Sequence, residues 1–276
     1  MQAIDVDLQH MEFALVRPLA DQGDAVAQNN LGVMYHRGHG VLQNYAEAMK
    51  WYRLSAGQGY AVAQSNLGLL YTKGHGVPQN YAEAVKWERP AADQGDANAQ
   101  YNLALMYEDG EGVPQDYAEA MKWYRLAADQ GNALSQSALG FMYDRGHGVL
   151  QNYAEAVKWF RKAADQGEAS GQNRLGVMYF YGNGVPQNYV EAAKWYRLAA
   201  DQGDATAQSN LGLIYYNGNG VPQDYVRAHM WFNLSAAQSE QDAIKYRDDV
   251  TLKMAPAQLT EAQKLAGEWK SKSTRR

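Results

Sequence analysis

The sequence predicts an all-α protein built as a solenoid of stacked helix-turn-helix units, and two observations carry this prediction. One 36-residue segment recurs six times, and its clearest copy reads PQNYAEAVKWERPAADQGDANAQYNLALMYEDGEGVP from Pro78 to Pro114. A fixed period of roughly 20 to 50 residues is typical of repeat architectures, in which neighbouring units bury a shared core. The apolar residues are also rich in Ala and Tyr rather than Ile and Val, which favours helices over strands.

The period holds without interruption at several kinds of position. Tryptophans mark it at Trp51, Trp87, Trp123, Trp159, Trp195 and Trp231. Glycines from Gly23 to Gly203 and leucines from Leu31 to Leu211 keep the same spacing. We therefore predict six repeats over residues 23–238, a single N-terminal helix at 1–22, and C-terminal capping helices with a frayed basic tail at 239–276.

The first helix of each repeat is expected to begin at Asp24 or Ala25 and to run to Arg37 in the first copy, because small and apolar side chains recur there with a period of 3.6. Gly38, which can adopt the left-handed conformation, is expected to close this helix. The second helix is expected to begin after an N-cap at Asn44 and to run to about Gly57. Glu47 stands three residues after Asn44, which is the spacing of a capping box.

Two residue types break the helical pattern. Gly32 and its equivalents lie inside the first helix, where glycine costs about 1 kcal/mol relative to Ala, so a close approach to a neighbouring helix is expected there. Pro90 lies inside the second helix and is expected to produce a kink or an early stop. Pro18 occupies the same repeat position, and the sequence assigns neither proline a function.

The C-terminal segment departs from the period. SEQDAIKYRDDVTLKM predicts a more charged helix, and Pro256 then interrupts the chain. QLTEAQKLAGEWK follows, with one apolar face formed by Leu259, Ala262, Leu265, Ala266 and Trp269. Atypical polar helices of this kind close the open end of a solenoid. The last six residues, SKSTRR, are expected to fray.

The motif A-x-A-Q-x-N-L-G-x-M-Y, followed by G-x-G-V-x-Q-[ND]-Y-x-E-A-x-K-W-[YF]-R-x-A-A-x-Q-G, resembles the Sel-1-like repeat, a longer-looped relative of the tetratricopeptide repeat. The resemblance covers roughly residues 20–237. It implies a right-handed α/α superhelix that acts as a scaffold or adaptor and binds other proteins. Bacterial relatives often take part in host interaction, envelope processes or signalling, but the resemblance identifies no partner for this chain.

Composition and charge exclude several function classes. The net charge of −5 argues against a surface that binds nucleic acid, and no run of 18 apolar residues predicts membrane insertion. The N-terminus lacks the basic start and apolar core of a signal peptide. The chain is therefore expected in the cytoplasm by default, or in the periplasm or outside the cell if a signal has been removed. The sequence leaves the oligomeric state open.

No cofactor, metal or catalytic group is expected. Without cysteine there is no thiolate ligand or Cys nucleophile, and no nucleophile–base pair stands out. His39, His75 and His147 occupy equivalent loops too far apart to share a zinc ion, and are interpreted as exposed. We therefore expect a non-enzymatic protein. The alternatives are a hydrolase acting on envelope polymers or β-lactams, or a purely structural spacer.

The expected binding surface is the variable stripe on the first helices, at positions equivalent to 26, 29, 30, 33 and 37. In this architecture the first helices line the concave side, where a protein or extended peptide would bind. The stripe contains an asparagine row at Asn30, Asn66, Asn102 and Asn210, interrupted by Ala138 and by Arg174. Such a row can hold a peptide backbone; the alternative is that each Asn bonds a neighbouring repeat.

Large side chains also gather on or beside the stripe, and they are candidate interface anchors. They are Tyr101, Phe141, Phe180, Tyr181 and Tyr216. Phe180 and Tyr181 stand out because the equivalent residues are mostly polar, whereas Phe141 has apolar equivalents and could be buried. We expect Arg174, Phe180, Tyr181 and Tyr216 to form the strongest binding patch.

Overall fold

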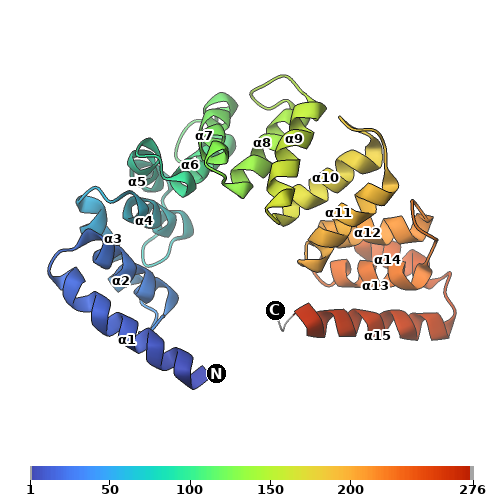
Figure 1. Ribbon diagram of the computed structural model, residues 1–276, viewed down its shortest axis with the longest axis horizontal. Helices are drawn as coiled ribbons and strands as arrows, with labels where there is room; N and C mark the ends of the chain where they lie inside the picture. The colour runs from blue at the N-terminus through green and yellow to red at the C-terminus, as the bar shows by residue number, and fades with distance from the viewer. Residues whose placement is uncertain (1, 274–276) are drawn as a thin grey trace. The chain divides into compact units, whose positions relative to one another are not determined.

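The computed structural model describes residues 2–273, and all regular elements within them are helices (Figure 1). In chain order they are α1 (Gln2–Asp21), α2 (Ala25–Arg37), α3 (Tyr45–Gly57), α4 (Ala61–Lys73), α5 (Tyr81–Asp93), α6 (Ala97–Asp109), α7 (Tyr117–Asp129), α8 (Ala133–Arg145), α9 (Tyr153–Asp165), α10 (Ala169–Tyr181), α11 (Tyr189–Asp201), α12 (Ala205–Asn217), α13 (Tyr225–Ala236), α14 (Gln241–Thr251) and α15 (Pro256–Ser273).

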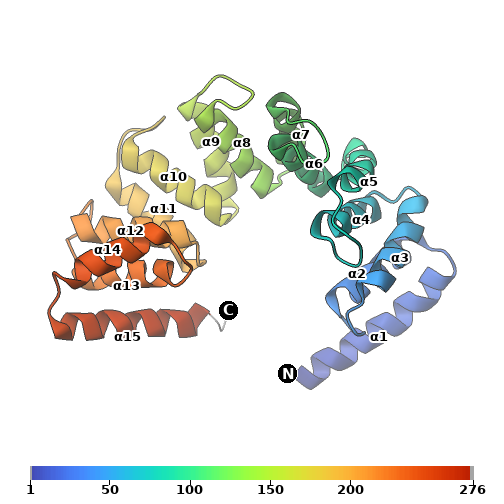
Figure 2. The same ribbon diagram turned by 180° about the vertical axis from the view of Figure 1, so that it is seen from behind.

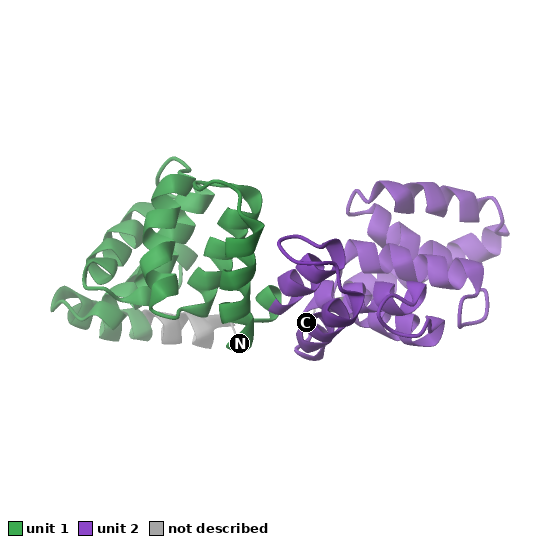
Figure 3. Ribbon diagram, turned by 90° about the horizontal axis from the view of Figure 1, so that it is seen from above, with its two compact units in different colours: residues 1–135 green, residues 136–276 purple. Residues whose placement is uncertain are grey.

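Each 36-residue repeat is one helix pair, from α2 and α3 in the first repeat to α12 and α13 in the sixth. The helices group into two compact units, residues 1–135 and 136–276 (Figure 3). Within the first unit, α2, α4 and α6 form one layer and α3, α5 and α7 form the other, as views from opposite sides show (Figures 1 and 2). The variable stripe therefore belongs to a continuous layer of first helices in that unit.

The second helices begin at the predicted N-caps, but the capping box is only half formed. Oδ1 of Asn44 accepts a hydrogen bond from the backbone N–H of Glu47 at 3.1 Å. The backbone N–H of Asn44 donates to the carbonyl of Tyr35 at 2.9 Å, so it needs no bond from the Glu47 side chain. Glu47 lies 3.8 Å from Lys50 instead. The first helix thus satisfies the N-cap of the second and fixes the connection between them.

The mid-helix glycines allow the close approach that the sequence predicted. A Cβ atom at Gly32 would lie 2.6 Å from the ring of Tyr52, which is fully buried in α3. At Gly140 the equivalent distance to the ring of Phe160 is 2.5 Å. Both distances are well below ordinary van der Waals contact. In these repeats the aromatic side chain leaves no room for a Cβ atom. At Gly68 the neighbouring side chain is Glu88, and the third repeat has Ala104 at this position.

A pair of glutamines joins the two helices of each repeat, and the buried member of the pair also reaches the preceding helix. Gln28 donates to the carbonyl of Ala20 at 3.2 Å and accepts a hydrogen bond from Gln58 at 2.8 Å. The same Gln–Gln bond recurs between Gln94 and Gln64, Gln130 and Gln100, Gln166 and Gln136, Gln202 and Gln172, and Gln238 and Gln208. The Gln–Gln bonds therefore hold the two helices of a repeat together. The buried glutamines also donate to a carbonyl of the preceding repeat, as Gln100 does to Ala92 at 3.1 Å and Gln208 to Ala200 at 3.2 Å, and these bonds fix the register of successive repeats.

The early stop expected at Pro90 is wrong. Helix α5 continues past Pro90 to Asp93 and has 13 residues, the same length as α3. The ring of Pro90 removes one backbone hydrogen bond, but Ala91 and Ala92 just beyond it are buried in the core. Packing of the last turn therefore outweighs the local cost of the proline.

The C-terminal cap has the predicted apolar face, with Ala262 and Ala266 buried. Helix α15 extends to Ser273, and the fraying predicted for the last six residues stays a prediction. Nε1 of Trp269 donates to Asp201 in α11 at 3.2 Å, which anchors this end of the helix. The remaining residues of the predicted tail, 274–276, lie outside the described residues.

We predict that Gly32→Ala lowers the free energy of unfolding by about 1–3 kcal/mol, because the added methyl group would overlap the ring of Tyr52. Gly57→Ala is the matched control: no heavy atom lies within 4 Å of a Cβ there, so the change should be neutral or stabilise by up to about 1 kcal/mol. Urea unfolding of both variants tests this. Equal effects of the two substitutions would contradict the packing argument.

Candidate functional site

The variable stripe is narrower than its sequence spacing suggested. Residues equivalent to position 29 are mostly buried, including Asn29, Ser137 and Asn173, so including this position in the exposed stripe was wrong. The reason is that this position faces the adjacent repeat, where Asn29 accepts a hydrogen bond from Asn66. Positions equivalent to 26, 30, 33 and 37 are half-buried or exposed, and they form the accessible stripe.

Most of the asparagine row is hydrogen-bonded within the fold. Three side chains donate an amide hydrogen to the preceding repeat: Asn66 to Asn29 (2.9 Å), Asn102 to Glu88 (3.0 Å) and Asn210 to Asn173 (3.0 Å). Asn30 is exposed and accepts a hydrogen bond from Asn29 at 3.4 Å. The interpretation that each Asn bonds a neighbouring repeat therefore holds for three of these four residues.

In unit 2, Phe180 and Tyr181 form an aromatic pair at the end of α10. Their ring centroids lie 5.0 Å apart in an edge-to-face arrangement, and Phe180 also packs edge-to-face on Tyr189. Phe180 is half-buried against the core, whereas Tyr181 is 65% exposed. Tyr181 is thus a large aromatic side chain held rigidly on the surface by its neighbour.

Arg174 and Phe141 form a second contact on the same face of unit 2. The guanidinium carbon of Arg174 lies 4.3 Å from the ring centroid of Phe141, a cation–π arrangement. Phe141 in turn packs edge-to-face on the buried ring of Phe160. Burial holds the pKa of Arg174 below its ordinary value. The stripe thus carries a partly desolvated cation beside an aromatic ring.

The side chain of Tyr216 is hydrogen-bonded to residues of the C-terminal helices, so its hydroxyl is already used within the fold. Its hydroxyl donates to a carboxylate oxygen of Asp249 at 2.6 Å and accepts a hydrogen bond from Lys253. These bonds lower the pKa of Asp249 and raise that of Lys253. Tyr216 therefore ties α12 to α14.

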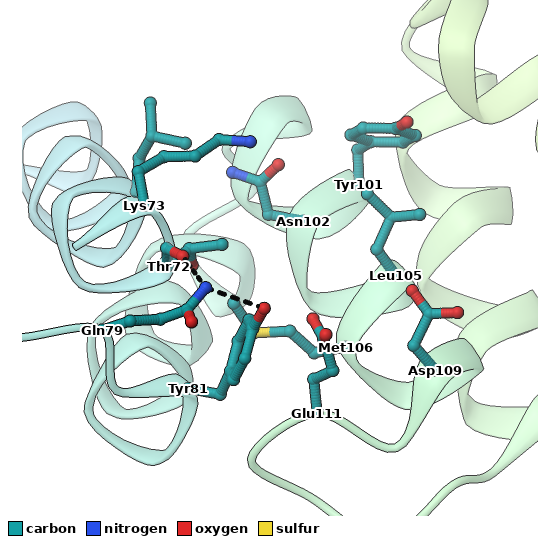
Figure 4. A pocket seen from close by; sticks show the side chains of 11 residues that line it. Thr72, Lys73, Gln79, Tyr81, Tyr101, Asn102, Leu105, Met106, Asp109 and Glu111 are labelled. Carbon is teal, nitrogen blue, oxygen red and sulfur yellow. Dashed lines mark hydrogen bonds between the residues drawn. The ribbon is translucent and has the colours of Figure 1, made fainter. Parts of the chain in front are cut away.

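In unit 1, Tyr101 and Asn102 line a pocket of about 480 Å³ between α4 and α6 (Figure 4). The wall from α4 includes Thr72 and Lys73, and the opposite wall ends in Asp109 and Glu111; Gln79 and Tyr81 contribute from the start of α5. Nε2 of Gln79 donates to the carbonyl of Thr72 at 2.8 Å and to the hydroxyl of Tyr81 at 2.9 Å. A second hollow of about 270 Å³ shares Leu69, Tyr101 and Asn102.

Glu88 lies fully buried behind this second hollow, and the sequence interpretation missed it. Its carboxyl group accepts hydrogen bonds from Ser65 and Asn102, each at 3.0 Å. Burial outweighs these bonds and raises the pKa of Glu88 to about 8. One signal could have revealed it, because the other five repeats have an aromatic residue at this position: Tyr52, Tyr124, Phe160, Tyr196 and Phe232.

The loop histidines do not all lie on the surface as predicted. His75 is half-buried and stacks on Tyr45 of the preceding repeat with ring centroids 4.4 Å apart. His147 is also half-buried, whereas His39 is exposed. Among the residues that the structure describes, no group of three or more His, Asp or Glu residues could hold a metal ion. Nor does any helix in residues 2–273 have the length and apolar character to cross a membrane.

Comparison with known families finds the Sel1 repeat in six consecutive segments, at residues 25–60, 61–96, 97–132, 133–168, 169–204 and 205–240. A Sel1 repeat protein from Oxalobacter formigenes is 33% identical, with a TM-score of 0.74 over 84% of this chain and 96% of that chain. None of the curated proteins matches significantly.

Two other solved structures are similar to the chain. The protective antigen c5321 of uropathogenic Escherichia coli, described as having an SLR fold, is 31% identical over 95% of this chain and 72% of that chain, with a TM-score of 0.43. Immunity protein Pa5087 from Pseudomonas aeruginosa is 19% identical over 77% of this chain and 81% of that chain, with a TM-score of 0.50. The latter likeness concerns the fold alone.

The raised pKa of Glu88 predicts a pH-dependent stability. Between its usual pKa of 4.5 and the folded-state value of about 8, the folded chain retains a proton that the unfolded chain has lost. Stability should therefore fall as the pH rises through this range and level off above it. Glu88→Gln should remove this component, since its neutral amide still offers an acceptor to Asn102. Urea midpoints of both proteins between pH 5 and 8 test this, and parallel profiles would disprove it.

Proposed function

Because the chain belongs to the Sel1 repeat family, we propose that it is a non-enzymatic scaffold or adaptor that binds a protein or extended peptide on the variable face of its first helices. The fold supports this proposal, since stacked helix pairs offer extended surfaces whose side chains vary while the core repeats. The accessible stripe has this character: its residues change from repeat to repeat beside the constant glycines and glutamines.

The observation that carries the proposal is the exposure of Tyr181. The equivalent residues in the other repeats are all polar or charged: Arg37, Lys73, Asp109, Arg145 and Asn217. Exposing an aromatic ring where every other repeat has a polar group gains the fold nothing, whereas a rigid aromatic ring is a typical interface anchor. Phe180 holds the ring in place, which reduces the entropy lost on binding.

The surroundings of Glu88, whose pKa is raised, support a binding function over catalysis. Glu88 has the raised pKa that a general acid needs, but it is fully buried and its oxygens are bonded to Ser65 and Asn102. A general acid must reach the group that it protonates. The raised pKa of Glu88 is therefore explained by its place in the core, and it does not favour a hydrolase.

We predict that Tyr181→Asn, which installs the residue found at position 217, reduces capture of the partner about tenfold or more without lowering thermal stability. Leu150→Ser is the control, because Leu150 is 89% exposed in a connecting loop away from the stripe. The measurement is an affinity pull-down from lysate of the source organism, quantified by mass spectrometry. Capture of the same proteins by all three chains, or of none, would favour the spacer interpretation.

A further inference from the structure

Arg174 is a cation with no carboxylate partner among residues 2–273. Four other repeats have Asn at this position and one has Ala. Its guanidinium is half-buried over the ring of Phe141, yet it forms no ion pair with any other described residue. Stacking on a ring leaves the N–H donors at the edge of the guanidinium plane unused, and this planar fork matches a carboxylate.

Tyr196 of α11 lies near Arg174 and supplies a second donor. Its side chain is only 3% exposed, and its hydroxyl has no hydrogen-bond partner in the described part of the chain. The equivalent Tyr124 donates to Glu108 at 2.6 Å, but in this repeat Phe180 replaces that glutamate and offers no acceptor. Arg174 and Tyr181 are both close enough to Tyr196 to influence its pKa, which burial raises.

The other charges near Arg174 are already paired elsewhere. Asp144 lies 3.7 Å from Arg145. Asp204 caps α12 and accepts a hydrogen bond from the backbone N–H of Ala207 at 2.6 Å. These two carboxylates weaken the positive field around Arg174 but do not occupy its donors. An anionic ligand would therefore be recognised by direct hydrogen bonds more than by long-range attraction.

The spacing on α10 indicates the shape of such a ligand. Arg174 and Tyr181 are seven residues apart, which corresponds to about 10 Å along a helix. An extended peptide covers this distance in about three residues. Phe141 lies beside Arg174 on the neighbouring first helix. The guanidinium therefore has one aromatic ring beside it, and the pair of Phe180 and Tyr181 offers a second apolar surface further along α10. Apolar surface lies on both sides of Arg174, so a peptide could continue in both directions from the carboxylate. This arrangement fits the side chain of Asp or Glu better than a C-terminal carboxylate.

We propose that this face of unit 2 binds an acidic peptide segment: an Asp or Glu side chain of the partner accepts hydrogen bonds from Arg174 and Tyr196, and an apolar side chain about three residues away packs on Phe180 and Tyr181. This inference rests on the proposed adaptor function and specifies the chemistry of the partner. The hydrogen bonds from Arg174 to this carboxylate join two charged groups, and Arg174 is partly shielded from water. Hydrogen bonds between charged groups are stronger than those between neutral groups.

Two substitutions test the proposal with little risk to folding, because other repeats carry the substituted residues. Arg174→Asn installs the residue found at Asn210, and Tyr196→Phe the one found at Phe160. The probes are dye-labelled, N-acetylated and C-amidated peptides with Asp or Asn three residues from Phe, in both orders, titrated by fluorescence anisotropy. We expect the full wild-type chain to bind an Asp peptide about tenfold or more tighter than its Asn counterpart.

Arg174→Asn should abolish this preference, and Tyr196→Phe should reduce it about threefold or more. Equal binding of Asp and Asn peptides to the wild type, no binding at all, or a preference that survives in Arg174→Asn would overturn the proposal. One further probe is the Asn peptide with a free C-terminal carboxylate in place of the amide. If this peptide binds and the C-amidated Asp peptides do not, the carboxylate comes from a chain end, and the proposal of an Asp or Glu side chain is overturned. If partner capture from lysate is lost in Tyr181→Asn but unchanged in Arg174→Asn, the adaptor function stands and the carboxylate inference falls.

Discussion

The contact between a helix glycine and the side chain packed on it sets the geometry of five of the six repeats; the third repeat has Ala104 at this position. A Cβ atom at Gly32 would lie 2.6 Å from the ring of Tyr52, and one at Gly140 would lie 2.5 Å from the ring of Phe160. The side chain at this second-helix position therefore lies directly beneath the variable face of the first helix. This side chain differs between repeats. It is an aromatic ring at Phe160, a buried carboxyl group at Glu88 and, at Tyr196, a tyrosine whose hydroxyl has no hydrogen-bond partner in residues 2–273.

Hydrogen bonds of the glutamines complement this contact, because they join the two helices of a repeat and tie each repeat to the preceding helix. Gln28 is buried, accepts a hydrogen bond from the exposed Gln58 of its own repeat and donates to the carbonyl of Ala20 in the preceding helix. The bond to the preceding helix permits one register, because a shifted register would leave a buried donor unpaired. With the core fixed by glycines, aromatics and glutamines, the side chains of the accessible stripe are free to vary.

The helix limits could be predicted from the sequence because they depend on local chemistry. Ala25–Arg37 and the N-cap at Asn44 follow from periodic burial, a left-handed glycine and a capping side chain, all within a few residues. The features that were missed depend on contacts between repeats. The burial of Glu88 and the engagement of Tyr216 by Asp249 involve residues 14 to 33 positions apart, for which a single sequence gives no distance information. Pro90 shows the same limit, since tertiary packing overrides a local rule.

The two candidate surfaces differ at one pair of equivalent positions. In unit 1 the side chain at the asparagine-row position, Asn102, donates to Glu88 on the second helix of the preceding repeat, so the fold itself supplies the carboxylate. In unit 2 the cation Arg174 occupies the asparagine-row position, and the preceding repeat has Phe160 where Glu88 would stand. Arg is a stronger donor than Asn, and in the described part of the chain no carboxylate forms an ion pair with it. A guanidinium held in this way is satisfied only by solvent or by an acceptor from another molecule, and the neighbouring aromatic residues favour an acceptor carried on a peptide with apolar side chains.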